Sequence, residues 1–166
     1  MSVRRGSRVA GGKASESAAP WGKPALLLDV NVLVALAWPN HVHHAAALAW
    51  FNDVAKGGFA TCPLTQSGFL RVSSNPRAIT PARTPREACE ILRRIAELPG
   101  HVFWTDDTDL ASTEHIAWER LGSHHQVTDA HLLAIALRHG GKLATFDREI
   151  VNLAPAAGSA VVLVPA

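Results

Sequence analysis

Short apolar runs alternate with longer segments of helical pattern along most of this 166-residue chain. The run that begins at Ala25 stays apolar until Asp29, as a strand buried on both faces of a parallel sheet does. Similar runs follow at Phe59–Cys62, His101–Thr105, Lys142–Thr145 and Ala160–Val164. Because strands alternate with helices, we expect an α/β fold: a three-layer sandwich with a mostly parallel central sheet of about five strands flanked by helices.

The segments between these runs predict helices with recognisable ends. Pro39 stops a first helix at Trp38, and Asn40 is a good N-cap for a second. Thr84 and Pro85 supply an N-cap and a proline at the first helical position. The expected helices are Val30–Trp38, His41–Ala55, Leu64–Ser74, Pro85–Leu98, Thr113–Leu121 and Thr128–His139.

The composition limits the class of protein. A chain of 17.7 kDa with 48% hydrophobic and 18% charged residues can bury one core, which excludes wholesale disorder. No apolar stretch approaches the roughly 18 residues of a membrane span, so no membrane contact is expected. Cys62 and Cys89 are isolated and form neither a disulfide framework nor a zinc ribbon pattern. A reducing, cytoplasmic location fits best.

The charge is unevenly distributed. Residues 1–24 form a basic tail rich in Gly, Ala and Ser, which we expect to be disordered, and residues 25–166 form the folded domain. Residues 1–23 carry five cationic side chains and one acidic one, whereas the whole chain is only +2, so the remainder is net negative. Contact with nucleic acid would therefore depend on local basic patches.

Three acids follow predicted strands or begin a predicted helix. Asp29 ends the first strand, Asp147 lies two residues beyond the strand Lys142–Thr145, and Asp129 is in the first turn of the helix Thr128–His139. Singly, each has an ordinary structural role as a cap, a first-turn acid or a turn residue. Together they would meet at the carboxyl edge of a parallel sheet, where ligands bind. Carboxylates that converge in this way suit Mg²⁺ or Mn²⁺.

The segments Leu26–Leu36, Thr128–Ala136 and Leu143–Asp147 resemble the three acidic motifs of PIN-domain ribonucleases, most closely the VapC toxins of bacterial toxin–antitoxin pairs. The resemblance spans about residues 25–164, with the motifs in the same order and spacing. It implies a PIN-like, Rossmann-like domain that hydrolyses RNA phosphodiesters with Mg²⁺ or Mn²⁺. It also implies a homodimer and a VapB-like antitoxin as partner. Asp29, Asp129 and Asp147 would be its catalytic and metal-holding residues.

The sequence departs from this family at one position. A glutamate is common in the helix after the second strand, and this chain has Gln66 there. An amide oxygen can hold a metal-bound water but lacks the charge of a carboxylate, so metal binding would be weaker. Further polar residues near the acids are Asn31, Thr128 and Thr145, each suited to a supporting role or to a cap or turn.

A group of arginines follows the Gln66 segment. Arg71, Arg77, Arg83 and Arg86, with Arg93 and Arg94 beyond them, fit either a solvated helix face or a track for RNA phosphates. The cluster His41–His44 has no complete tetrahedral metal set nearby, so a solvated helix start is favoured over zinc.

Two other function classes stay open. A PIN fold weakened at Gln66 would be an RNA- or protein-binding module without catalysis. The other class is a Mg²⁺-dependent phosphatase with an aspartyl nucleophile. The sequence favours it less, because that reaction needs a second acid close after the first, whereas Val30 and Asn31 follow Asp29.

Overall fold

The computed structural model describes residues 25–153 and 160–166; the tail predicted for residues 1–24 lies outside them. Five parallel strands form one sheet in the order β3-β2-β1-β4-β5. The strands are β1 (Leu26–Leu28), β2 (Phe59–Thr61), β3 (His101–Phe103), β4 (Lys142–Thr145) and β5 (Val161–Leu163). All five predicted strands are therefore present, and every strand pairing among the described residues is parallel.

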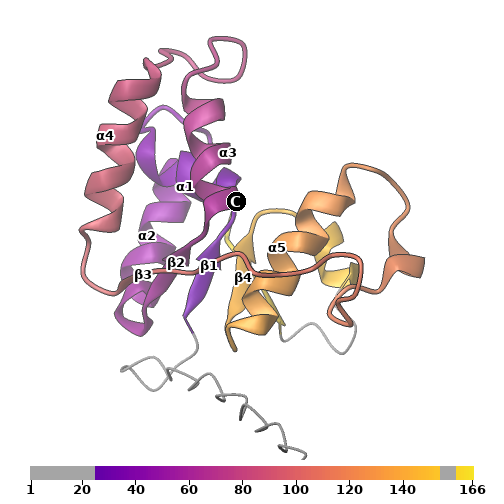
Figure 1. The fold of residues 1–166 in the computed structure, drawn as a ribbon. Coiled ribbons are helices and arrows are strands. Elements are labelled where there is room, and N and C mark those ends of the chain that lie inside the picture. The colour runs from indigo at the N-terminus through magenta and orange to yellow at the C-terminus, as the bar shows by residue number, and fades with distance from the viewer. Residues whose placement is uncertain (1–24, 154–159) are drawn as a thin grey trace, which may run out of the picture.

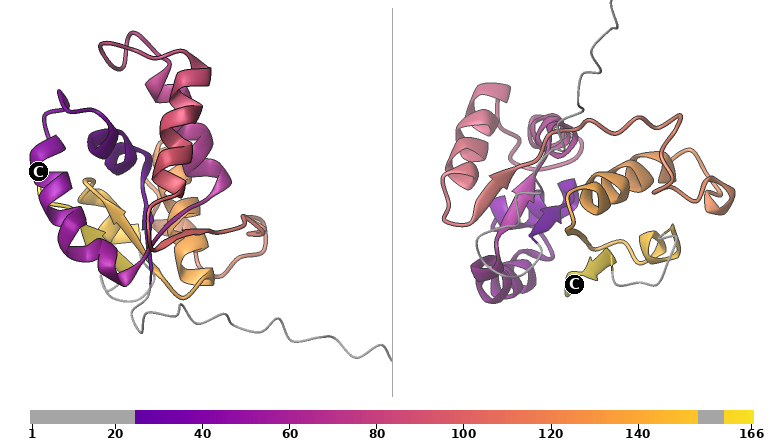
Figure 2. Two further views of the ribbon diagram at one scale, coloured as in Figure 1. Left: turned by 90° about the vertical axis from the view of Figure 1, so that its left-hand side faces the viewer. Right: turned by 60° about the horizontal axis from the view of Figure 1, so that its bottom comes forward.

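The sheet carries helices on both faces, which gives the predicted three layers (Figures 1 and 2). One face packs against α1 (Val30–Ala37), α2 (His44–Val54), α3 (Pro63–Ser73) and α4 (Pro85–Ala96). The other face packs against α5 (Gln126–Arg138). Short 3-10 turns lie at η1 (Ala55–Gly57), η2 (Trp118–Arg120) and η3 (Glu149–Leu153).

Side chains alternate between two cores because successive residues of a strand point to opposite faces. Leu27 and Leu143 are fully buried beneath α5, whereas Leu28 and Phe59 are buried beneath the first four helices. The register joins Leu27 to Leu143 and Leu28 to Ala144, so neighbouring strands present matching faces. The register and the two cores therefore fix which face each strand residue points to and how far along the sheet it lies. They also fix the position of the residues that follow each strand.

Helix α4 begins as the sequence predicts. The Thr84 hydroxyl accepts a hydrogen bond from the Glu87 backbone N–H, and the Glu87 carboxylate accepts one from the Thr84 backbone N–H at 2.8 Å. Pro85 occupies the first helical position. This reciprocal capping satisfies two backbone donors that would otherwise lack partners.

Helix α2 starts later than the sequence predicts. Asn40 is not its N-cap, because its side-chain amide donates instead to the carbonyl of Thr80, forty residues away. Residues 41–43 form a turn, and the helix begins at His44. A contact between distant segments has replaced the expected local cap.

The helix predicted over Thr113–Leu121 is wrong. Only the three-residue turn η2 forms there. The Asp109 carboxylate accepts hydrogen bonds from the Ala111 backbone N–H and the Ser112 hydroxyl, and the Thr113 hydroxyl accepts one from the His115 backbone N–H. These local bonds give the backbone an alternative to a helix, while Ile116 and Ala117 still reach the core.

Candidate active site

The three predicted acids meet at the carboxyl edge of the sheet. Asp29 directly follows β1, and its backbone N–H donates to the Ala144 carbonyl of the neighbouring β4 at 3.0 Å. Asp147 lies two residues beyond the end of β4. Asp129 is in the first turn of α5, a helix that packs on both β1 and β4. Three segments far apart in sequence therefore bring these acids near enough for their charges to interact.

Thr145 links two of these acids. Its hydroxyl donates to Asp29 Oδ2 at 2.8 Å and accepts from the Asp147 backbone N–H at 3.1 Å. Thr145 is fully buried and Asp29 is only 6% exposed, so this bond is shielded from water. A shielded bond to a charged acceptor is stronger than an exposed neutral one. Thr145 thus fixes the Asp29 carboxylate and the turn that carries Asp147.

The environment of Asp29 disfavours its charge. Burial raises the pKa of its carboxyl above the ordinary value, and the nearby charge of Asp147 adds to the rise. The Thr145 hydroxyl and the backbone N–H groups of Val30 and Asn31 act in the opposite direction. Asp29 therefore holds its negative charge at a cost that a cation beside it would relieve.

Asp129 shows the same effect more strongly. Burial, followed by the charges of Asp29, Asp147 and Glu149, raises the pKa of Asp129 from 3.8 to about 6, while His125 opposes the rise. Because these charges act on one another, the carboxylates form a single electrostatic group. Glu149 is not among the site residues predicted from the sequence, where its only signal is an acid two residues after Asp147.

The donor set suits a hard cation. No group of three or more His, Cys, Asp or Glu side chains within residues 25–153 and 160–166 is already placed to hold a metal ion. Mg²⁺ does not need one, since it keeps several waters and takes one or two direct carboxylates together with substrate phosphate. Mutually repelling oxygen donors fit such an ion, and the pKa values of Asp29 and Asp129 are raised. Asp29, Asp129 and Asp147 are the residues that would hold it.

Gln66 is turned toward a different face of the sheet. Its amide nitrogen donates to the Thr61 hydroxyl at 3.0 Å, and that hydroxyl lies 2.8 Å from His101 Nε2. Thr61 alternates with Ala60 along β2, so its side chain points to the face that carries α3, whereas Thr145 points to the face of α5. The side-chain amide nitrogen of Gln66 is thereby engaged in a hydrogen bond, and its side-chain oxygen has no hydrogen-bond partner among the described residues.

The remaining predicted residues are solvent-facing. Asn31 and Thr128 are exposed in the first turns of α1 and α5. Thr128 is not the helix cap that the sequence suggested, because α5 begins two residues earlier at Gln126. Four arginines are likewise exposed: Arg71 at the end of α3, Arg77 and Arg83 in the following loop, and Arg86 at the start of α4.

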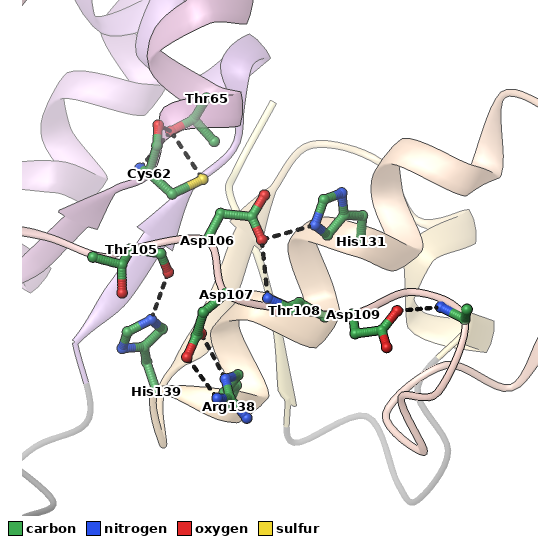
Figure 3. A network of polar contacts seen from close by, with 11 residues as sticks. Cys62, Thr65, Thr105, Asp106, Asp107, Thr108, Asp109, His131, Arg138 and His139 are labelled. Carbon is green, nitrogen blue, oxygen red and sulfur yellow. Dashed lines mark hydrogen bonds and ion pairs between the residues drawn. The ribbon is translucent and has the colours of Figure 1, made fainter. Parts of the chain in front are cut away.

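A polar network holds α5 in place (Figure 3). Asp106 Oδ1 lies 3.0 Å from His131 Nε2, and Arg138 donates two hydrogen bonds to the Asp107 carboxylate. His139 stacks on Trp104 with ring centroids 4.8 Å apart. These contacts fasten the loop after β3 along α5, and so they fix the helix that carries Asp129.

Two other polar clusters carry no comparable chemistry. His44 Nδ1 lies 2.8 Å from the Ala35 carbonyl, and the His43 ring packs against Phe146. The described part of the chain therefore uses the His41–His44 cluster for packing and forms no zinc site there. A shallow hollow of about 430 Å³ lies over the loop from Asp107 to His115. None of the three candidate carboxylates lines it.

Comparison with known proteins gives a consistent picture. A family model described as PIN domain matches residues 26–155. Ribonuclease VapC39 of Mycobacterium tuberculosis is 46% identical over 130 residues, which cover 78% of this chain and 94% of that protein. Ribonuclease VapC38 of the same organism is 45% identical over 128 residues, covering 77% and 89%.

The fold also matches a solved structure. The crystal structure of VapBC2 from Rickettsia felis bound to a DNA fragment from their promoter aligns with a TM-score of 0.56 at 13% identity. The alignment covers 85% of this chain and 99% of that chain. At this identity the match supports the fold.

Proposed function

The chain belongs to the PIN domain family, and from this premise we propose that it is an endoribonuclease that acts as the toxin of a toxin–antitoxin pair. The observation that carries the proposal is the coupled group of Asp29, Asp129 and Asp147, brought by three distant segments to one sheet edge. Close similarity to proteins named ribonucleases supports RNA as the substrate. The phosphodiester backbone would lie across this edge.

The proposed cofactor is Mg²⁺ or Mn²⁺. When bound, such an ion would polarise the scissile phosphodiester and lower the pKa of an attacking water. The chain's own residues would position the acids around such an ion. The Thr145 hydroxyl orients the Asp29 carboxylate and also accepts a hydrogen bond from the Asp147 backbone N–H. Asp129 is held in the first turn of α5. Because its pKa is raised to about 6, Asp129 keeps its proton to a higher pH than an ordinary aspartate does, and a cation beside it would favour the ionised form.

Cleavage of a labelled single-stranded RNA, with and without a chelator, tests this proposal. Asp29→Ala, Asp129→Ala and Asp147→Ala should each reduce metal-dependent cleavage at least about a hundredfold, because several kcal/mol of charge stabilisation are lost. Asp53→Ala, at an exposed acid of α2, is the control. If the three variants fold, as shown by circular dichroism, and still cleave at the wild-type rate, the assignment is wrong.

A binding module without catalysis is the second candidate, and Gln66 is the observation that favours it. Its side chain is neutral and its amide is bonded to Thr61, so it contributes no charge to the carboxylate edge. The same cleavage assay separates the two functions, because a binding module would retain RNA without cutting it.

The proposed partners are a VapB-like antitoxin and a second copy of this chain. A guanidinium group can pair with two carboxylate oxygens, so a basic segment could neutralise the site by inserting an arginine. We place the protein in the cytoplasm, where its RNA substrate is found; Cys62 and Cys89 are both free thiols. No helix of the described residues is long and apolar enough to span a membrane.

A further inference from the structure

Basic side chains gather on the side of the sheet edge that carries α3 and α4. Residues 71–94, from the end of α3 through most of α4, contain six arginines and two glutamates. In the loop that leads toward α5, by contrast, Asp107 pairs with Arg138 and Asp106 lies against His131. A polyanion that approaches the carboxylates therefore meets net positive charge on the α3–α4 side.

The basic segment stands beyond the sheet. Helix α3 leaves the carboxyl end of β2 and rises past the sheet, and α4 returns toward the start of β3, so loop 74–84 lies at the far end (Figure 1). The α5 helix begins on the other side of the same edge (Figure 1). Loop 74–84 and the helix ends beside it are called the tip below. The tip carries Arg71, Arg77, Arg83 and Arg86, which we name the tip arginines.

The tip is held by contacts to its own helices and to the segment that follows α1. The Arg83 backbone N–H donates to the Ser73 carbonyl at 2.9 Å, which closes the loop at its base. Trp38 Nε1 donates to the Pro81 carbonyl, and Asn40 donates to the Thr80 carbonyl. Ile79 is buried in the core beneath. Side chains on such a loop are presented in a fixed place, so less entropy is lost when they bind.

The tip arginines are exposed and weakly engaged. Arg71 and Arg77 make no ion pair with any acid in the described part of the chain. Arg83 lies near Glu87, whose carboxylate is already bonded to Thr84. Arg86 pairs with Glu90 at 3.4 Å, but both side chains are largely solvated, and such pairs contribute little. Their charge is therefore available to an external anion.

We propose that the tip arginines bind the backbone phosphates of the RNA a few nucleotides from the scissile bond, so that the strand reaches the carboxylates from the α3–α4 side. The inference rests on the proposed ribonuclease function and adds the direction of the substrate. Four acids near the scissile position repel RNA, and fixed cations on one flank offset that repulsion. Phosphate contacts of this kind position a strand without reading its sequence.

Arg94 offers a matched control. It is an exposed arginine on α4, but it lies in the last turn, far from the tip, where its charge complements the carbonyl end of the helix. Replacing it changes the net charge of the protein by the same amount as replacing one tip arginine. A difference between the two positions therefore reports location and not overall charge.

The test measures binding of a fluorescein-labelled single-stranded RNA by anisotropy as a function of salt, in an Asp129→Asn background that keeps the RNA intact. Each lost phosphate contact should lower the salt slope by about 0.7 and weaken binding about fivefold at 0.1 M salt. The variant Arg71→Gln/Arg77→Gln/Arg83→Gln should thus lose about a hundredfold in affinity and about two units of slope. Arg94→Gln should change the affinity by no more than about twofold and should leave the salt slope close to the wild-type value.

The outcomes separate the inference from the proposed function. If wild-type protein cleaves RNA but the triple variant binds with an unchanged slope, the tip does not contact the strand and the inference is overturned. It is equally overturned if Arg94→Gln and a single tip variant weaken binding to the same degree, or if the triple variant keeps its RNA affinity and loses only the capture of a protein partner. If wild-type protein neither binds nor cleaves RNA, the ribonuclease proposal itself fails.

Discussion

Thr145 is the residue on which the geometry of the carboxylates depends. Thr145→Val keeps the shape of the side chain but removes the hydroxyl that donates to Asp29 and accepts from the Asp147 backbone. We expect a loss of about 1–3 kcal/mol in the free energy of unfolding, because a buried acceptor is left without its donor. Metal affinity should fall about 10- to 100-fold.

Urea denaturation and calorimetric titration with Mn²⁺ measure the two effects. Thr145→Ser retains the hydroxyl and is the matched control, so it should keep most of the metal affinity even if it loses some packing. Equal metal affinities for the valine and serine variants would show that the hydroxyl has no role in the site.

Asp129 makes the stability of the metal-free protein depend on pH. Its pKa is about 6 in the folded chain against an ordinary 3.8, so the folded state binds the additional proton between these values. The stability that this proton provides is fully present below pH 3.8 and is lost as the pH rises through about 6. Asp129→Asn should flatten the fall in melting temperature over that range.

Carboxyl NMR titration checks the same point directly, and added Mg²⁺ should move the Asp129 titration to lower pH because a cation favours the ionised form. Asp53→Asn, at an exposed acid of α2, should leave the pH profile of stability unchanged. An Asp129 that titrates near its ordinary value without metal would contradict the coupled carboxylate group.

Gln66 and Glu149 decide whether a fourth carboxylate takes part. Glu149→Gln removes a charge that faces Asp129, so Mn²⁺ affinity should fall about three- to tenfold, about 0.6–1.4 kcal/mol.

Gln66→Glu should tighten Mn²⁺ binding if residue 66 reaches the rim of the site, because a carboxylate is the stronger oxygen ligand. Calorimetric titration compares both variants with Glu97→Gln at the end of α4. An unchanged affinity in Gln66→Glu would place residue 66 outside the metal site.

At the scale of the elements, a close contact between α1 and α3 sets the start of α1. A Cβ at Gly68 would lie 2.5 Å from Cγ2 of Val30, the residue that follows Asp29. In a free helix, glycine to alanine would gain about 1 kcal/mol, but the clash should reverse the sign and cost about 1–3 kcal/mol. Gly68→Ala should therefore lower both stability and metal-dependent cleavage.

A double variant makes this prediction specific. Val30→Ala opens the space that the new methyl group needs, so Gly68→Ala should cost less in that background than in the wild type. Thermal unfolding of the four proteins gives the coupling energy. Additive effects would mean that the two helices are not in close contact at these residues.

At the scale of the whole molecule, the negative body and its carboxylate edge favour a basic partner. Co-expression with a VapB-like protein encoded beside this chain should yield a complex in which cleavage is inhibited. Size-exclusion chromatography with light scattering should show a homodimer of this chain within it. A monomer that neither co-purifies with that protein nor loses activity beside it would leave a free-standing nuclease.

The sequence alone determined the elements whose signals are local. Five short apolar runs predicted all five strands, and the Thr84 N-cap with Pro85 at the first helical position predicted the start of α4. The order of Asp29, Asp129 and Asp147 relative to these elements also placed them at one edge, since the carboxyl ends of parallel strands share an edge. Periodicity, caps and strand ends are properties of neighbouring residues, which is why a sequence reveals them.

Tertiary structure decided whatever depends on partners distant along the chain. Asn40 bonds to Thr80 instead of capping α2, and Gln66 bonds to Thr61 on the face away from α5. The hydroxyl of Thr145 reaches Asp29 across 116 positions of sequence. The rise in the pKa of Asp129 comes from burial and from charges on other segments. Hydrogen bonds and electrostatic interactions act over distances in space, and only the folded chain brings these groups within that range.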